Sequence, residues 1–199
     1  RLSLDKDVIL PGTTPTTIPS DFLKRASSEL QQLKTLFKGR EHSAAYRYTL
    51  FHYAQVWGSR VALIQGGADN SVFDHNRIKA AVAICQQQAS DSENPFLLIK
   101  GAVGGIQKYI YHDIKAEQIG DADKSSKRLR GRSFLVAHLS QVFAEQVIER
   151  LGQTEAQILF VGGGHFHLLL PNTVHLPEKI DKLIAEFNLG LQQSLGTPL

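Results

Sequence analysis

The sequence has 199 residues, of which 42% are hydrophobic and 21% are charged, and its formal net charge is +3. This length suits one domain, or one domain with part of a second, and the composition excludes wholesale disorder. A net charge of +3 does not by itself indicate nucleic-acid binding, so that argument depends on local clusters of basic residues.

The cysteine count and the hydropathy pattern indicate the compartment. Cys85 is the single cysteine, so an internal disulfide is impossible and a reducing compartment fits. No apolar run approaches the length of a membrane span, and the first residues lack a signal-peptide pattern. We therefore expect a cytoplasmic protein. Because the sequence starts at Arg1 and contains no methionine, we also expect a fragment of a longer chain.

The first 90 residues are predicted to be mainly helical. Residues 1–20 are rich in Pro and Thr, which is typical of an extended arm. Ser20 and Asp21 can cap a helix that follows over about 22–37.

Two more helices are expected before residue 90. Aromatic-rich residues 42–64 predict a mostly buried helix, and residues 71–88 predict another, with Cys85 on its core-facing side. Asp74–His75 lies at the start of the latter. Since a metal-dependent HD hydrolase needs several converging His and Asp residues, we interpret Asp74 as a helix-start acid favoured by the helix dipole.

The sequence pattern changes after Pro95, from helical periodicity to apolar runs that end in glycines. Residues 96–105 form an apolar run that ends in glycines, which predicts a buried strand followed by a tight turn. Residues 106–114 predict a helix. The polar residues 117–131 are predicted to be loop, and a long amphipathic helix is expected over 132–151.

The last part of the chain predicts a hairpin and a helix. Strands are expected over 157–161 and 165–172 around a glycine turn, and Pro177 suits the first position of the final helix. One more strand, beginning near Thr197, would complete a ferredoxin-like βαββαβ unit.

The predicted fold class is therefore α+β. It consists of a helical region over residues 1–90 and a ferredoxin-like domain over 95–199, whose last strand is expected where the sequence ends.

The hairpin FVGGGHFHLLLPNT (160–173) is the first candidate site. Its glycines permit a tight turn and the close approach of a ligand. His165 and His167 alternate along a strand, so both are expected on one face. Mg²⁺ prefers oxygen ligands, and two histidines are too few for a transition-metal site, so we predict no metal here. A plain turn and a nucleotide contact both remain open.

Two further stretches are candidates for phosphate contact. The loop GAVGG (101–105) follows a strand and precedes a helix, where backbone N–H groups can hold a phosphate, although a tightly packed turn fits equally. KSSKRLRGR (124–132) has five basic residues in nine and no acid. This run fits either a solvated surface or contact with phosphates.

Three blocks together resemble a known family. They are GAVGGIQKYIY (101–111), SSKRLRGRSFLVAHLSQ (125–141) and ILFVGGGHFHLLLPNT (158–173). In this order they resemble the first palm domain of the large subunit of Csm-type type III CRISPR–Cas effector complexes. Upstream, SVFDHNRIKAAVAI (71–84) is similar to the helix that joins that family's HD-type nuclease domain to its palm. The resemblance covers roughly residues 71–175.

The resemblance implies a function for the parent protein. In that family two palms face each other, and the second, with a GGDD motif, converts ATP to cyclic oligoadenylates when target RNA is bound. The first palm lacks the acidic pair and completes the nucleotide pocket. Some members also cut single-stranded DNA with the HD domain. The present sequence has Ala102 where an acid is usual and GGGH in its hairpin, and no His-Asp pair near its start.

The resemblance therefore implies a palm with no catalytic and no metal-binding residues of its own. It implies nucleotide binding at Gly104, Gly105, Gln107, Gly162, Gly163, Gly164 and His165. It implies contact with phosphates or nucleic acid at Lys124, Lys127, Arg128, Arg130 and Arg132. ATP and Mg²⁺ are expected only in the assembled parent enzyme. The expected partners are the second palm, the small and backbone subunits of the complex, guide RNA and target RNA.

Two other functions stay open. One is a free-standing RRM-like module for single-stranded RNA, a class that clusters aromatic residues on its open sheet face. Phe96, Phe160 and Phe166 lie on the predicted strands without that clustered signature. The other is an active nucleotidyltransferase, against which the missing acidic pair argues.

Overall fold

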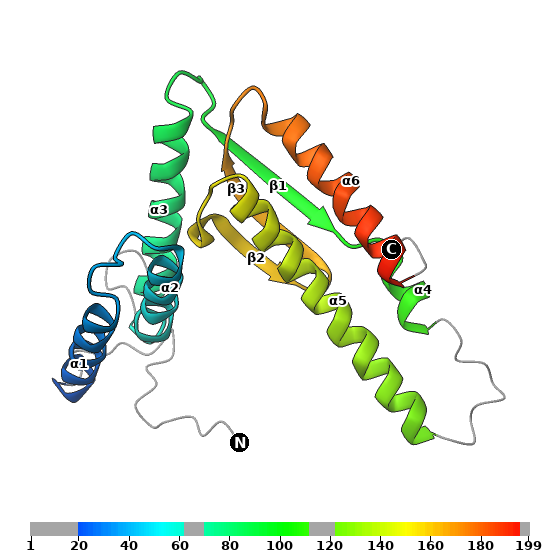
Figure 1. Ribbon diagram of the computed structural model, residues 1–199, viewed down its shortest axis with the longest axis horizontal. Helices are drawn as coiled ribbons and strands as arrows, with labels where there is room; N and C mark the ends of the chain where they lie inside the picture. Colours follow the sequence, from blue (N-terminus) through cyan, green and yellow to red (C-terminus); the bar gives the residue numbers. More distant parts are fainter. Residues whose placement is uncertain (1–19, 62–69, 112–121, 196–199) are drawn as a thin grey trace. The chain divides into compact units, whose positions relative to one another are not determined.

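The computed structural model describes residues 20–61, 70–111 and 122–195 (Figure 1). The predicted N-terminal arm and the predicted last strand near Thr197 lie outside these ranges. The chain divides into two compact units, residues 1–80 and 81–199, and each unit is described by itself. The functional division into residues 1–90 and 95–199 stays a prediction.

The first unit contains α1 (Ser20–Leu36), α2 (Ala44–Gly58) and the start of α3 (Val72–Gln88). Ser43 caps α2, since its side chain accepts a hydrogen bond from the Tyr46 amide. Trp57 of α2 is buried, and its indole N–H donates to Glu29 of α1 over 2.8 Å. The ring of Phe22 packs edge-on against Trp57 at a centroid distance of 4.9 Å. An aromatic cluster therefore joins α1 to α2.

The prediction that the second helix is mostly buried is wrong within this unit. Trp57 is the buried residue of α2, whereas the side chains of Tyr48 and Val56 are 47% and 49% exposed. α2 packs against α1 and, through Phe51, against Phe73 at the start of α3, and its remaining face stays in contact with solvent.

The second unit contains a sheet of three strands in its described residues. β1 (Phe96–Ala102), β2 (Ile158–Gly162) and β3 (His165–Pro171) lie in the order β1-β3-β2, with both neighbours antiparallel to β3. β1 and β2 consequently run in the same direction on either side of β3. This is the order of the first three strands of a ferredoxin-like unit, so the α+β class is confirmed, while the fourth strand stays a prediction.

The connecting helices complete the unit. They are α4 (Ile106–Tyr111), α5 (Ala122–Arg150), the short 3₁₀ helix η2 (Glu155–Gln157) and α6 (Leu176–Leu195). In Figure 1, α5 and α6 run alongside the sheet and cover one of its faces. Arg150 of α5 pairs with Glu186 of α6, which ties the two helices together at the surface.

The start of α5 corrects one prediction. The segment 117–131 was expected to be loop, but the helix begins at Ala122 and continues through Gly131. A glycine inside a helix costs only about 1 kcal/mol, and the leucine and basic residues around it favour helix. Arg130 also donates to the Ser126 hydroxyl one turn earlier, at 3.0 Å.

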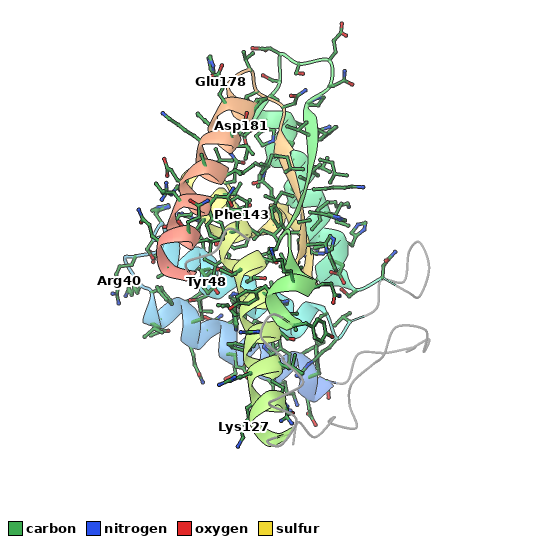
Figure 2. The ribbon with its side chains drawn as sticks, turned by 90° about the vertical axis from the view of Figure 1, so that its right-hand side faces the viewer. Arg40, Tyr48, Lys127, Phe143, Glu178 and Asp181 are labelled. Carbon is green, nitrogen blue, oxygen red and sulfur yellow. The ribbon has the colours of Figure 1, made fainter. Side chains whose placement is uncertain are left out.

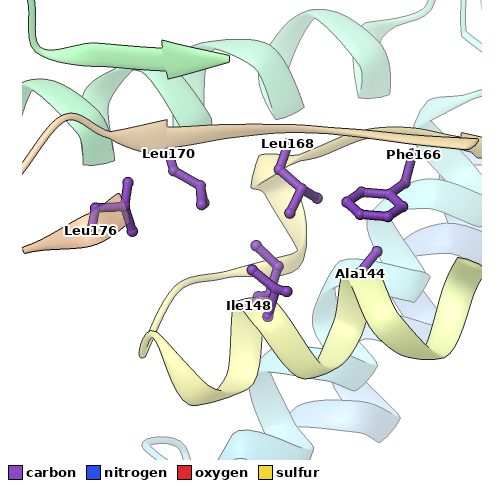
Figure 3. Close-up of a cluster of buried hydrophobic side chains, with 7 residues drawn as sticks. Ala144, Ile148, Phe166, Leu168, Leu170 and Leu176 are labelled. Atoms are coloured by element: carbon purple, nitrogen blue, oxygen red, sulfur yellow. The ribbon is translucent and has the colours of Figure 1, made fainter. Parts of the chain in front are cut away.

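The core lies between the sheet and the helices that cover it (Figure 3). Phe166, Leu168 and Leu170 alternate along β3 and are at most 5% exposed. They meet the buried face of α5 and the first residue of α6, through Ala144, Val147, Ile148 and Leu176. Burial of each large side chain contributes about 1.5–3 kcal/mol. The alternation leaves the odd-numbered residues of β3 on the opposite face, which is open at His165 and closed at Pro171.

A buried polar cluster fixes the end of α3 against β3. Gln157 is fully buried, and its amide N–H₂ donates to the Leu169 carbonyl over 3.1 Å. Its amide oxygen accepts from the Thr154 N–H at 3.0 Å. The thiol of Cys85, which is also fully buried, lies 3.7 Å from the same Leu169 oxygen. The predicted core position of Cys85 is therefore confirmed.

Among the described residues, no helix is both long enough and apolar enough to cross a membrane.

Candidate nucleotide-binding surface

The two glycine segments predicted as separate motifs lie side by side. Ala102, at the end of β1, pairs with His165, at the start of β3. One residue later, the Val103 amide donates to the Gly164 carbonyl over 2.8 Å. The loop after β1 and the β2–β3 turn therefore form one continuous surface at the same end of the sheet.

This close approach needs glycine in the turn. Gly163 and Gly164 have φ angles of 58° and 82°, which L side chains rarely adopt. A Cβ at Gly164 would lie 2.2 Å from Cδ1 of Ile106, the first residue of α4. Gly164 is buried and leaves no room for a side chain. Gly163 is exposed, and a Cβ there would meet open space.

The loop after β1 is the other half of this surface. Gly104, Gly105 and Gln107 are exposed, and Gly105 has a φ of 69°. The Val103 amide is already bonded to Gly164, so it does not offer a free donor to a ligand. α4 has only six residues, so the electrostatic effect of its N-terminus adds little to the case for an anion site.

The open face of the sheet carries basic side chains beside the turn. His165 and His167 share this face, as the alternation predicts, and His167 pairs with Lys100 of β1. The His165 Nδ1 atom lies 3.1 Å from the Gly163 carbonyl, which orients the ring. The Phe160 ring of β2 packs beside His167 at 5.5 Å. Lys100 was missed in the sequence, where only the register of β1 against β3 would have placed it.

These residues do not fit a magnesium ion. The cross-strand positions nearest the turn hold Ala102 and His165, and the next pair holds Lys100 and His167. Mg²⁺ prefers oxygen ligands, mainly carboxylates, and these pairs supply none. Within the described ranges no three His, Cys, Asp or Glu residues cluster as a metal site would require.

The basic block of α5 splits into two environments. Lys127, Arg128 and Arg130 are exposed, and Figure 2 shows Lys127 at one end of the helix, well away from Phe143. Arg132 is half-buried instead, and its Nη1 donates to the Ile110 carbonyl at the end of α4 over 3.2 Å. The side chain of Lys124 lies outside the described part.

The exposed basic residues also lie beyond the glycine surface. A Cβ at Gly164 would lie 3.6 Å from Val136 Cγ1, so this point of α5 is level with the hairpin turn. Lys127 precedes Val136 by nine residues, which at 1.5 Å per residue is about 13 Å along the helix axis. The structure therefore does not bring Lys127 and the glycine turn into one compact site.

The contacts of Asp74 and the burial of Cys85 indicate structural roles and not catalytic ones. Asp74, in the first turn of α3, accepts a hydrogen bond from the Ser71 hydroxyl at 2.7 Å and pairs with Arg77 at 3.4 Å. Its interpretation as a helix-start acid is confirmed. Burial raises the pKa of the Cys85 thiol, and the hydrogen bond from Gln157 offsets part of this shift. The thiol is consequently a poor nucleophile at neutral pH.

Comparison with known proteins gives the family. The family model for Csm1 subunit domain B matches residues 95–199. A curated relative from Mycobacterium tuberculosis, described as the CRISPR system single-strand-specific deoxyribonuclease Cas10/Csm1 (subtype III-A), is 27% identical over 96% of this chain. The aligned part is 26% of that protein, so the chain spans about a quarter of the relative's length.

Solved structures agree with this fold. Csm1 from T. onnurineus has a TM-score of 0.67 at 22% identity, over 92% of this chain and 26% of that one. Csm1–Csm4 cassettes in complex with cA4 and with one ATP have TM-scores of 0.65 and 0.64, both at 23% identity over 87% of this chain and 23% of theirs. With the family match over more than half of its residues, the chain belongs to the Csm1 family.

Proposed function

We propose that residues 95–199 form a palm domain without catalytic acids, which scaffolds a type III CRISPR effector large subunit in antiviral defence. In this proposal it supplies half of an ATP site for cyclic oligoadenylate synthesis. The observation that carries it is the joined surface of the Val103 loop and the Gly164 turn, beside a strand pair that holds Ala102 and His165.

The proposed nucleotide surface consists of the exposed loop after β1 and the β2–β3 turn, in which Gly163 is exposed and Gly164 is buried, with basic side chains beside them. It comprises Gly104, Gly105, Gln107, Gly162, Gly163, Gly164 and His165, together with Lys100. Exposed glycines let a nucleotide approach the backbone closely. Lys100 carries a positive charge that suits a triphosphate. The Mg²⁺ ions would be held by acidic residues of the second palm, because this surface offers no carboxylate.

The comparisons support this proposal by analogy. The similar Csm1–Csm4 cassettes were solved with ATP and with cA4, and that ligand chemistry is the one proposed for the assembled parent protein. Csm4 in those cassettes likewise supports other effector subunits as partners. Residues 1–90 would be the remnant or tail of an HD-like helical region.

The exposed basic residues at the start of α5 suit a longer anionic partner. Because Lys127 lies about 13 Å beyond the turn along the helix, Lys127, Arg128 and Arg130 fit contact with guide or target RNA better than with the same nucleotide.

The test is ATP binding by the full-length protein with both palms, purified with its complex partners. Gly163→Asn adds a side chain in open space while tolerating the positive φ, so it should block the ligand without unfolding the hairpin. Lys100→Ala should weaken ATP more than adenosine, whereas Lys179→Ala, on the exposed side of α6, should change neither. Unchanged ATP affinity in both Gly163→Asn and Lys100→Ala would contradict the proposal.

An RRM-like module for single-stranded RNA is the second candidate, because Phe96 and Phe160 are 41% and 50% exposed on the open face. They pair with Pro171 and His167, which lie four residues apart on β3, or about 13 Å. Phe166 lies on the buried face. Bases stacked on neighbouring rings would need a tighter cluster. Fluorescence anisotropy with labelled single-stranded RNA separates the two functions, since binding lost on Phe160→Ala would favour the RNA module.

A further inference from the structure

We infer that Arg132 is a positioning residue for the proposed nucleotide surface and not a ligand of phosphate, an inference that rests on the proposed function. Its Nη1 donates to the Ile110 carbonyl over 3.2 Å. The guanidinium carbon lies 5.6 Å from the centroid of the Tyr109 ring. Both contacts join Arg132 of α5 to the last turn of α4.

α4 is the element that Arg132 would hold in place. It has six residues, too few for a helix to be stable without tertiary contacts. Its first residue, Ile106, packs against Gly164 of the hairpin, and the Tyr109 amide donates to the Gly105 carbonyl over 2.9 Å. The hairpin thus fixes the start of α4, and Arg132 fixes its end.

This arrangement connects Arg132 to the ligand surface. Gly104 and Gly105 lie directly between β1 and α4, so their backbone geometry depends on where α4 sits. A helix that frays at Tyr109 and Ile110 releases the Gly105 carbonyl from its hydrogen bond. The loop then loses the shape that the proposed site requires.

The other arginines of the same block are different. Arg130 is exposed and donates to Ser126 of its own helix. Arg132 needs a planar guanidinium, which donates at its edge to a carbonyl while its face lies over an aromatic ring. A lysine ammonium lacks this planar fork and reaches less far, so Arg132→Lys keeps the charge and weakens the positioning.

The two roles of Arg132 make different predictions for ligands. A residue that shapes the loop affects every ligand that binds there, whether or not the ligand carries phosphate. A phosphate ligand affects ATP strongly and adenosine hardly at all. The comparison of ATP, ADP and adenosine therefore separates the two roles, and hydrogen exchange confined to the amides of α4 separates local fraying from general loss of the fold.

The experiment uses the full-length protein with both palms, bound to its partners. Dissociation constants for ATP, ADP and adenosine are measured by calorimetry for wild type, Arg132→Met, Arg132→Lys and Tyr109→Leu. Lys179→Met is the control, since this exposed side chain of α6 belongs neither to the proposed nucleotide surface nor to the basic residues proposed to contact RNA. Hydrogen exchange of the amides at 106–111 reports on α4 directly.

We expect both Arg132 variants to weaken all three ligands by a similar factor of about ten, the size expected for one lost charged hydrogen bond. Tyr109→Leu should give a smaller loss of the same pattern, and exchange at 106–111 should accelerate. Lys179→Met should stay within about twofold of wild type.

Three results overturn the inference. Loss of ATP binding with adenosine unchanged would make Arg132 a phosphate ligand, and full affinity in Arg132→Lys would make its charge sufficient. Unchanged affinity in Arg132→Met would leave it without a role. Failure of the wild type to bind ATP would instead overturn the proposed function, and the inference with it. If Arg132→Met does not fold, Arg132→Lys and Tyr109→Leu still decide the question.

Discussion

Ala102 and His165 lie directly opposite each other across the β1–β3 ladder, at the end of the sheet where β1 enters the glycine loop. Opposite residues of an antiparallel pair have Cβ atoms about 4.5–5.5 Å apart, a spacing at which two carboxylates could share a divalent metal. The sequence departs from the family pattern at Ala102 and at His165, and in the structure these two positions form one cross-strand pair.

Placing acids at Ala102 and His165 should create affinity for a divalent metal. In the double variant Ala102→Asp/His165→Asp, the two carboxylates repel each other, so their pKa values should rise. Without metal, the unfolding free energy of this variant should fall as the pH rises through those pKa values. Added Mn²⁺ should reverse that loss. Thermal melting at pH 5 and pH 8, with and without Mn²⁺, measures both effects, and Ala102→Asn/His165→Asn is the uncharged control.

If Mn²⁺ stabilises the double-acid variant no more than it stabilises the asparagine control, the placement of Ala102 opposite His165 is contradicted.

Gly101 should be required for the core. A Cβ at this position would lie 1.9 Å from Cζ of Phe166, because the Phe166 ring covers the backbone of β1. Gly101→Ala should therefore lower the unfolding free energy by about 1–3 kcal/mol, the usual cost of overpacking. Denaturant titration measures this loss.

Gly131 gives the opposite expectation and serves as the control. It lies within α5, and a Cβ there would meet no atom within 4 Å. Gly131→Ala should raise stability by about 0.5–1 kcal/mol. Equal effects of the two substitutions would contradict the packing described for Phe166.

Replacing the buried Gln157 should lower the free energy of unfolding. Gln157→Leu keeps the approximate volume but leaves the Leu169 carbonyl and the Thr154 amide without the amide group that each now contacts. An unsatisfied buried polar group costs about 1–3 kcal/mol, and the Leu169 carbonyl keeps its contact with the Cys85 thiol, so a loss in that range is expected by denaturant titration. Gln141→Leu, on the surface of α5, should stay within about 0.5 kcal/mol of wild type. A neutral Gln157→Leu would mean that water replaces these bonds.

The burial of Cys85 should make the stability of the protein depend on pH in the alkaline range. Its pKa is raised above the ordinary value of 9.0 mainly by desolvation. A group with a raised pKa contributes its stability fully below its unfolded pKa, and that contribution is lost as the pH rises toward the folded pKa. The stability of wild type should therefore fall more above pH 9 than that of Cys85→Ala.

Alkylation offers a second readout for the same thiol. Iodoacetamide should react with the native protein at pH 8 much more slowly than with the denatured protein. Equal rates would show that the thiol is accessible and would contradict its place in the core.

Much of the fold could be predicted because its signals are local. The alternation of β3 placed His165 and His167 on one face, and Pro177 lies one residue after the start of α6. The start of α5 was missed because Gly131 and the polar residues before it resemble a loop, while their neighbours favour helix.

The candidate surface was only partly predictable because its key contacts are long-range. The roles of Lys100 and Arg132 depend on partners distant in the sequence, His167 for the former and Ile110 for the latter. No local pattern distinguishes Arg132 from Arg130 two residues earlier. The contact between Val103 and Gly164 likewise joins two motifs that are some sixty residues apart in the sequence.

ATP turnover tests most directly whether this palm domain lacks catalysis of its own. The purified chain is mixed with ATP and Mg²⁺, alone and together with the second palm proposed to carry the acidic pair, and pyrophosphate and oligoadenylates are measured. We predict no product from this chain alone, and product from the pair that is lost on Gly163→Asn. Pyrophosphate release by this chain alone, abolished by Gly163→Asn, would show instead that this palm is itself catalytic.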